Sequence, residues 1–159
     1  TLVERRKLVR TSSTPGCTRG INLFRIELGG DAKLDLADLP GYGYAQRSKS
    51  ERKAWGPLIE GFLSNRAGLA GVVLIIDIRR GLQEDDVELV RYLEHLKRPV
   101  FLVATKIDKL PASQRAGALA KLGEEAGVRA IGFSSVSGEG RAALWRLILR
   151  ATHIEIPKS

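Results

Sequence analysis

The sequence of 159 residues contains only one cysteine, Cys17. A single cysteine excludes a disulfide within the chain and fits a reducing compartment, so we expect a cytoplasmic protein. No stretch approaches the roughly 18–20 uninterrupted apolar residues of a membrane-spanning helix. The opening residues, Thr1–Lys7, do not have the pattern of a secretory signal peptide. We therefore expect no interaction with a membrane.

A phosphate-binding loop is also missing. None of the 17 glycines is followed by lysine, so the sequence holds no G-x-x-x-x-G-K-[ST] motif. Where that motif occurs, its backbone N–H groups and its lysine hold the phosphates of a nucleotide. The chain as given lacks this main grip on phosphates, so we expect it to bind a nucleotide at best very weakly.

Acidic residues are fewer than basic ones: 18 Asp and Glu stand against 26 Lys and Arg, a formal net charge of +8. The basic residues are concentrated at Arg5, Arg6, Lys7, Arg10 and Arg19, within 47–53 and within 141–150. A basic surface favours polyanions, above all nucleic acid. A solvated, arginine-rich surface explains the same composition, and charge alone does not decide between the two interpretations.

Apolar patterns predict the strands. Segments 21–28 and 33–37 alternate apolar and polar residues around a glycine-rich turn and predict a β-hairpin. Continuous apolar runs at 72–76, 100–104 and 130–133 predict strands of a parallel sheet. We expect the run at 72–76 to be buried on both of its faces.

Amphipathic patterns predict helices over 48–65, 83–96, 113–126 and 141–151. A hairpin followed by alternating strands and helices is typical of a three-layer α/β domain with a mainly parallel sheet. The sequence shows no linker or internal repeat, so we expect one domain over 1–159.

Asp38-Leu39-Pro40-Gly41 follows the predicted strand 33–37 and has the form D-x-x-G. In nucleotide switches the Asp of such a motif holds Mg²⁺, usually through water, and the Gly N–H meets the terminal phosphate. A strand that ends in a Pro-Gly turn needs no ligand, and taken alone the motif fits that simpler interpretation better.

Thr105-Lys106-Ile107-Asp108 follows the predicted strand 100–104. One carboxylate accepts both N1–H and the exocyclic amino group of guanine, whereas adenine lacks N1–H, so Asp108 would discriminate between the bases. The stem of Lys106 would lie along the base. Asn is more usual than Thr at the first position, and a polar loop with an incidental ion pair is the alternative. The motif indicates guanine binding.

Two further loops fit the same scheme. Phe133-Ser134-Ser135 follows the predicted strand 130–133, where a backbone N–H could read guanine O6; a turn that caps the last helix explains it equally well. The polar loop 11–19 could supply a Thr hydroxyl to magnesium, or could simply be flexible. The motifs occur in one required order at strand ends, which is where α/β sheets bind ligands. That order favours a nucleotide site.

The sequence resembles the EngB (YihA/YsxC) family of ribosome-assembly GTPases, in the TrmE–Era–EngA–EngB–Septin group. The resemblance extends over nearly the whole chain and rests on these segments: 14–18, 21–24, Asp38-Leu39-Pro40-Gly41-Tyr42-Gly43-Tyr44-Ala45, Trp55, 72–79, Ala104-Thr105-Lys106-Ile107-Asp108-Lys109-Leu110 and 133–135. It implies a Ras-like P-loop NTPase fold, bound GTP or GDP with Mg²⁺, and GTPase activity. It also implies a monomer that acts on the precursor of the large ribosomal subunit and is needed for cell division and septation.

The resemblance implies a set of nucleotide-binding residues, with Thr18 and Asp38 as magnesium ligands. They are Gly16, Cys17, Thr18, Arg19, Gly20, Asp38, Leu39, Pro40, Gly41, Thr105, Lys106, Ile107, Asp108, Phe133, Ser134 and Ser135. Arg19-Gly20 replaces the family's usual Gln-Leu, and Cys17 replaces Lys or Arg, but neither removes Thr18. Tyr42 stands where Ras-like enzymes have a water-orienting Gln, so the catalytic residues are unknown and we expect slow intrinsic turnover.

The resemblance also places the start of the chain just after the family's phosphate loop and first strand. We therefore expect an N-terminally truncated form of a longer protein. Two functions remain open: a GTPase switch in ribosome assembly, and a degenerate, nucleotide-free domain that binds RNA or the ribosome. The missing loop favours the second function, whereas Thr18, Asp38 and Asp108 favour the first.

Overall fold

The computed structural model describes residues 20–29, 31–39 and 49–155. The chain divides into two compact units, one formed by 1–6 and 69–152 and the other by 7–68 and 153–159. Each unit is described by itself below. Among the described residues, no helix combines the length and the hydrophobicity needed to cross a bilayer.

The first unit is built on a three-stranded parallel sheet in the order β3-β4-β5. The strands are β3 (Val72–Asp77), β4 (Val100–Thr105) and β5 (Ala130–Phe133). Asp77 is paired in register with Thr105, and Thr105 with Phe133, so the strands end side by side. The loops that follow β3, β4 and β5 therefore leave from the same edge of the sheet.

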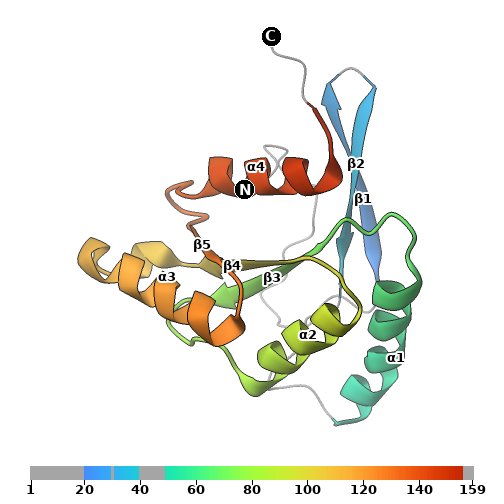
Figure 1. The fold of residues 1–159 in the computed structure, drawn as a ribbon, viewed down its shortest axis with the longest axis horizontal. Helices are drawn as coiled ribbons and strands as arrows, with labels where there is room; N and C mark the ends of the chain where they lie inside the picture. The colour runs from blue at the N-terminus through green and yellow to red at the C-terminus, as the bar shows by residue number, and fades with distance from the viewer. Residues whose placement is uncertain (1–19, 30, 40–48, 156–159) are drawn as a thin grey trace. The chain divides into compact units, whose positions relative to one another are not determined.

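Helices cover both faces of this sheet. They are α2 (Glu84–His95), α3 (Ala112–Ala126) and α4 (Arg141–Thr152), with a short 3₁₀ helix, η1 (Ile107–Lys109), after β4. Figure 1 shows α4 on one side of the strands and α2 and α3 on the other. The sheet is therefore the middle of three layers, which confirms the predicted fold class.

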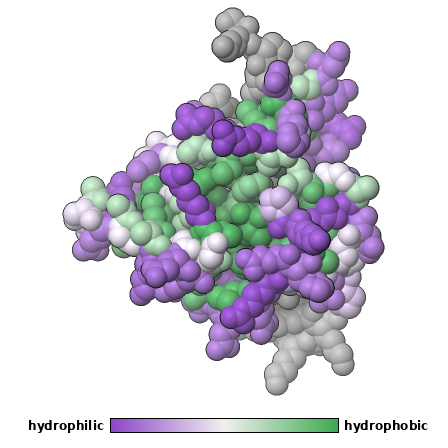
Figure 2. Space-filling model, in the orientation of Figure 1, coloured by the Kyte–Doolittle hydropathy of each residue, from purple (hydrophilic) through white to green (hydrophobic). Residues whose placement is uncertain are grey.

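The core of this unit centres on β4. Leu102 and Ala104 of β4 and Leu93 of α2 are completely buried. Both faces of a middle strand are covered by helices, which is why β4 reads as a continuous apolar run. Figure 2 shows that apolar residues, in green, also reach the surface near the middle of the view, with hydrophilic residues, in purple, around them.

The burial predicted for the run at 72–76 is wrong. Leu74 and Ile76 are buried, but Ile75 between them is 66% exposed. Successive side chains of a strand point to opposite faces, so β3 is covered on one face and open on the other. β3 also ends the sheet order β3-β4-β5, and within the described residues it pairs with no strand other than β4, so it has a neighbouring strand on one side only.

The second unit contains the predicted hairpin, formed by the antiparallel strands β1 (Asn22–Gly29) and β2 (Ala32–Asp38), and the helix α1 (Lys49–Asn65). Arg25 and Asp35 face each other across the strands, and the Arg25 Nε and Nη2 donate to the two Asp35 carboxylate oxygens at 2.8 and 2.9 Å. The strand β2 ends at Asp38.

Candidate functional site

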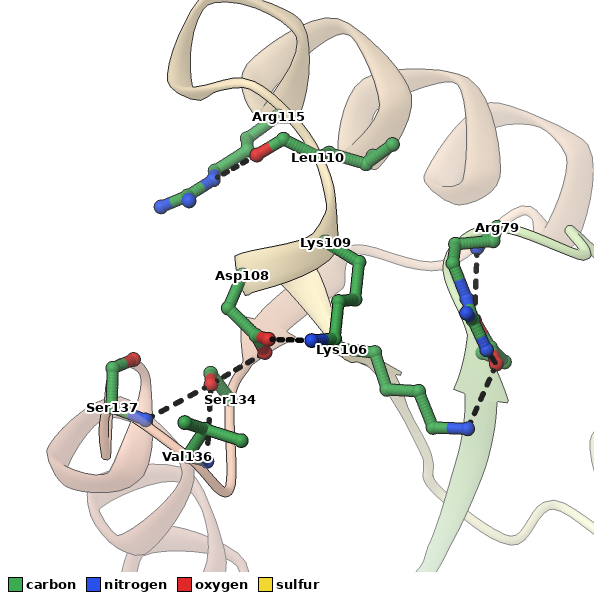
Figure 3. Close-up of polar contacts among 10 residues, drawn as sticks. Arg79, Lys106, Asp108, Lys109, Leu110, Arg115, Ser134, Val136 and Ser137 are labelled. Carbon is green, nitrogen blue, oxygen red and sulfur yellow. Dashed lines mark hydrogen bonds and ion pairs between the residues drawn. The ribbon is translucent and has the colours of Figure 1, made fainter.

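The carboxyl ends of β3, β4 and β5 form the candidate site. Ligands of α/β proteins bind at this edge because the loops that leave parallel strands converge there. In the first unit these loops bring Lys106, Asp108 and Ser134 together, although 26 positions separate Ser134 from Asp108 (Figure 3). Their meeting follows from the register of the strands and from the loop geometry described next.

The loop after β4 is tied to the end of β3. The Thr105 Oγ1 donates a hydrogen bond to the Ile76 carbonyl oxygen at 3.0 Å. The Ile78 N–H in turn donates to the Thr105 carbonyl oxygen at 3.1 Å. The Thr105 hydroxyl therefore ties the end of β4 to the neighbouring strand β3.

Lys106 turns the chain out of β4. Its φ of 61° and ψ of 31° lie in the left-handed region, which costs a residue other than glycine about 1–2 kcal/mol. The turn is closed by the Lys109 N–H, which donates to the Lys106 carbonyl oxygen at 2.9 Å and starts η1. The side chain of Ile107, 2% exposed, anchors the turn in the core.

Ser134 holds the Asp108 carboxylate. Its hydroxyl is completely buried and donates to Asp108 Oδ1 at 2.7 Å. The same Oγ accepts hydrogen bonds from the N–H groups of Val136 and Ser137 at 3.2 and 3.1 Å. The hydrogen bond from Ser134 lowers the pKa of Asp108, helped by Lys109 and opposed by desolvation. Asp108 is thus a fixed, ionised acceptor at the sheet edge.

The loop that supplies Ser134 depends on a glycine. Gly140 has a φ of +83°, and a β-carbon at this position would collide with the carbonyl oxygen of Gly132. The Ser134 N–H donates to the Glu139 carbonyl oxygen at 3.0 Å, and the Gly138 N–H donates to the Ser134 carbonyl oxygen at 2.9 Å. The tight return of the chain from β5 to α4 therefore requires glycine at position 140.

A second carboxylate, Asp77, lies at the end of β3. Both of its oxygens accept hydrogen bonds from Arg79, at 2.9 Å from Nε and 2.6 Å from Nη2. Its Oδ2 also lies 3.1 Å from Lys106 Nζ. These partners, Arg79 before Lys106, hold the pKa of Asp77 far below its usual range against the effect of burial. Figure 3 shows Lys106 extending away from Asp108 and toward Arg79.

The sequence did not assign Asp77 to the site. One signal was available in the sequence: Asp77 directly follows the apolar run 72–76, just as the polar residues Asp38 and Thr105 directly follow other predicted strands. Which loop Asp77 would meet depends on the register that pairs it with Thr105, and register is a property of the folded sheet.

The structure brings one group of the predicted residues together at this edge. The group consists of Thr105, Lys106, Ile107, Asp108, Phe133, Ser134 and Ser135. Phe133, 8% exposed, and Ile107 point into the core, so they support the loops and do not offer side chains to a ligand. Ser135 is exposed beside them.

The other predicted residues are not among the described residues of the first unit. In the second unit, Asp38 is the last residue of β2, while Gly20 and Leu39 flank the strands of the hairpin. The remaining ones lie outside the described residues: Gly16, Cys17, Thr18, Arg19, Pro40, Gly41 and, at the position of the water-orienting Gln, Tyr42.

The described residues contain no group of three or more His, Cys, Asp or Glu side chains that could enclose a metal ion. Of the two magnesium ligands expected from the sequence, only Asp38 is described, half-buried at the end of β2. A carboxylate at a strand end fits Mg²⁺, which binds through one or two protein oxygens and keeps several waters. The donor chemistry is therefore compatible with a nucleotide-bound Mg²⁺.

Comparison with known proteins identifies this arrangement. Residues 1–106 match the family described as 50S ribosome-binding GTPase. A relative from Trichlorobacter lovleyi, a probable GTP-binding protein EngB, is 43% identical over 159 residues, which cover 98% of this chain and 79% of the relative.

Solved structures share the P-loop GTPase fold. A crystal structure of a probable GTP-binding protein EngB has a TM-score of 0.69 at 24% identity, and the match covers 91% of this chain and 86% of that one. Era in complex with MgGDPNP and nucleotides 1506–1542 of 16S ribosomal RNA has a TM-score of 0.72 at 21% identity, with coverage of 94% and 48%. The sequence identity to the curated relatives and the match over residues 1–106 show that the chain belongs to the EngB family of GTP-binding proteins.

Proposed function

We propose that the protein is a GTPase switch that binds the guanine base at the edge formed by β4 and β5. The observation that carries the proposal is the Asp108 carboxylate, ionised and held at 2.7 Å by the buried hydroxyl of Ser134. A carboxylate fixed in this way accepts two parallel N–H donors without having to reorganise, which is what guanine offers and adenine does not.

Neighbouring residues complete the proposed base site. In the proposed arrangement the base lies along the Lys106 stem, which is directed away from Asp108. The backbone N–H of Ser135, in the loop after β5, is the proposed donor to guanine O6. The core positions of Ile107 and Phe133 hold these loops at fixed spacing, so the recognition geometry exists before the nucleotide arrives.

The phosphate end of the proposed site uses Gly16–Gly20 and Asp38–Gly41, with Thr18 and Asp38 as ligands of Mg²⁺. The bound ion would neutralise charge on the phosphates. Tyr42 replaces the Gln that orients water in Ras-like enzymes, so we propose slow intrinsic hydrolysis that a ribosomal partner accelerates.

The proposed target is the precursor of the large ribosomal subunit. Support for the large subunit comes from the matching family, which is described as 50S ribosome-binding GTPase. Era, which shares the fold, was solved with a segment of 16S ribosomal RNA, an RNA of the small subunit, and so supports contact with ribosomal RNA in general. A net charge of +8 favours binding to RNA. Under this proposal the protein is a cytoplasmic monomer whose loss impairs ribosome assembly, and through it cell division and septation.

The test uses the product of the complete open reading frame that encodes these 159 residues, titrated with fluorescent GDP and ADP. We expect a preference for GDP of at least about 100-fold, because a buried polar site rejects a base that leaves its groups unpaired. Equal binding of GDP and ADP would contradict the assignment of Asp108.

The variant Asp108→Asn sharpens this test. An amide accepts from N1–H but donates to position 2, where guanine has an amino group and xanthine has a carbonyl oxygen. We therefore expect Asp108→Asn to lose about 100-fold in GDP affinity and to gain affinity for XDP. The matched control is Asp31→Asn, in the exposed hairpin turn, which should change neither.

The basic composition supports a second candidate, a nucleotide-free RNA-binding module. That function predicts no binding of GDP or ADP, together with RNA binding that weakens steeply as salt concentration rises. The same titration, repeated with ribosomal RNA at two salt concentrations, separates the two candidates.

A further inference from the structure

Asp77 is an ionised side chain of the sheet edge to which the proposed base site gives no role. It does not face the position of the base but joins two loops, since it binds Arg79 from the loop after β3 and Lys106 from the loop after β4. We propose that Asp77 is a positioning residue for the nucleotide, which holds the Lys106 side chain in the orientation that receives the base. The inference rests on the proposed function and names a further residue of the same site.

The need for such a residue follows from the chemistry of lysine. Its four-carbon stem has many rotamers, and about half of the Lys106 side chain is exposed (52%). A base that stacked on a freely rotating stem would have to immobilise it on binding and would lose affinity by doing so. An ammonium group already held at 3.1 Å by Asp77 removes part of this cost before the nucleotide arrives.

Asp77 is itself held in place. The Arg79 guanidinium engages both carboxylate oxygens, and the Arg79 N–H donates to Oδ1 at 3.1 Å. The carboxylate is only 14% exposed, so water competes weakly for it. The backbones of Asp77 and Thr105 are paired in register, so the sheet places the anchor point beside the start of the Lys106 turn.

The test is a double-mutant cycle with fluorescent GDP on the product of the complete open reading frame. Asp77→Asn keeps the shape but removes the charge, and Lys106→Met keeps an apolar stem but removes the ammonium group. We expect Asp77→Asn to weaken GDP binding about threefold to tenfold in the parent protein and less than about twofold in the Lys106→Met background.

A merely structural role gives a different result, because damage to the fold would weaken binding by the same factor in both backgrounds. That outcome overturns the inference, as does GDP affinity of Asp77→Asn within about twofold of the parent. If the parent protein binds no GDP at all, the proposed function fails and the inference fails with it. The matched control is Asp35→Asn, which removes the charge of another carboxylate that accepts hydrogen bonds from two nitrogens of one arginine. This variant should leave GDP affinity unchanged.

A measurement on the unmutated protein covers the case in which Asp77→Asn does not fold. Nuclear magnetic resonance of lysine ammonium groups without nucleotide should find Lys106 protected from proton exchange. Lys121, 77% exposed and 3.8 Å from Glu125, is the reference for a surface ammonium group. Exchange of Lys106 as fast as that of Lys121 would show that Asp77 does not hold it and would overturn the inference.

Discussion

Two aspartates, one in each unit, are held in place by different chemistry. Asp108 accepts from the neutral hydroxyl of Ser134, which is completely buried and 26 positions distant. Asp35 is held by the charged guanidinium of Arg25, its neighbour across the hairpin, at an exposed surface. Both contacts lower the pKa of the carboxyl group.

The difference concerns the charge that is left for a ligand. A hydroxyl orients the carboxylate and leaves its charge largely available, whereas a guanidinium with two parallel hydrogen bonds offsets it. The Lys109 ammonium lies 3.6 Å from Asp108 Oδ2, which is farther than the 2.8 Å between Arg25 Nε and Asp35 Oδ1. The carboxylate that we propose binds the base is thus held by a buried neutral donor, whereas the carboxylate that joins the two strands of the hairpin is held by an arginine.

The largest expected effect comes from breaking the loop that carries Ser134. Gly140→Ala places a β-carbon against the Gly132 carbonyl oxygen at a φ of +83°. We expect the free energy of unfolding to fall by about 2–4 kcal/mol, from the combined strain and overpacking. Chemical denaturation measures it, with Gly117→Ala as the control, since nothing lies within 4 Å of a β-carbon at that helical position. Equal stability of the two variants would contradict the role of Gly140.

Ser134→Ala tests the neutral donor itself. The N–H groups of Val136 and Ser137 lose their acceptor, so we expect the free energy of unfolding to fall by about 1–3 kcal/mol. The pKa of Asp108 should rise toward its ordinary value, because Ser134 is the first cause of its lowering. GDP binding should then be lost at a higher pH than in the parent protein as the solution is acidified.

Carboxyl carbon resonances of Asp108, followed by nuclear magnetic resonance across the acidic range, measure that pKa directly. Ser137→Ala is the control, because among the described residues its hydroxyl accepts from the Glu139 N–H, at 3.3 Å, and not from a group that contacts Asp108. An unchanged pKa of Asp108 in Ser134→Ala would remove the basis of the comparison between the two aspartates.

Thr105→Val tests how strongly the candidate site depends on the hydrogen bond between the ends of β4 and β3. Valine keeps the shape and the β-branch but leaves the Ile76 carbonyl oxygen without the hydroxyl that donates to it at 3.0 Å. We expect a loss of about 1 kcal/mol in the free energy of unfolding, the usual contribution of one such hydrogen bond. GDP affinity should fall by less than in Ser134→Ala, since Thr105 orients the loop and not the carboxylate. A larger fall would give Thr105 a direct contact with the nucleotide.

Much of the fold could be predicted from the sequence because apolar periodicity is a local property. The hairpin predicted at 21–28 and 33–37 is observed at Asn22–Gly29 and Ala32–Asp38, and the last helix, predicted over 141–151, at Arg141–Thr152. The exposure of Ile75 could not be predicted in this way. A β-branched run looks the same whether one or both faces of its strand are covered, and coverage is decided by distant elements.

The site was predictable to the same extent. Lys106, Asp108 and Ser134 were assigned from short motifs at strand ends, and the structure brings them together. The burial of the Ser134 hydroxyl and the contact of Asp77 with Lys106 follow from strand register and from the left-handed turn at Lys106, which no local pattern encodes. The sequence thus named candidate side chains, and the structure supplies the contacts among them.

The smallest expected effect belongs to the hairpin pair. The pKa of Asp35 is lowered in the folded protein, first by the hydrogen bonds from Arg25. A lowered folded pKa stabilises the protein above the pKa of the unfolded chain, about 3.9 for Asp, and this contribution is lost as pH falls through the folded value. Because the pair is exposed, we expect Asp35→Asn to leave the unfolding midpoint at pH 7 almost unchanged.

Measurements at acidic pH test whether the Arg25–Asp35 pair acts on stability alone, unlike Asp108, which we expect to act on GDP affinity. From pH 7 down to about 3.9, the small difference in stability between the parent and Asp35→Asn should stay constant, and it should shrink only at lower pH, as pH falls through the folded pKa of Asp35. GDP affinity should not differ at any pH in that range, because the charge of Asp35 is already offset by Arg25. A change in GDP affinity would show that an arginine-paired carboxylate of the hairpin also serves the ligand, and would break the distinction drawn between the two aspartates.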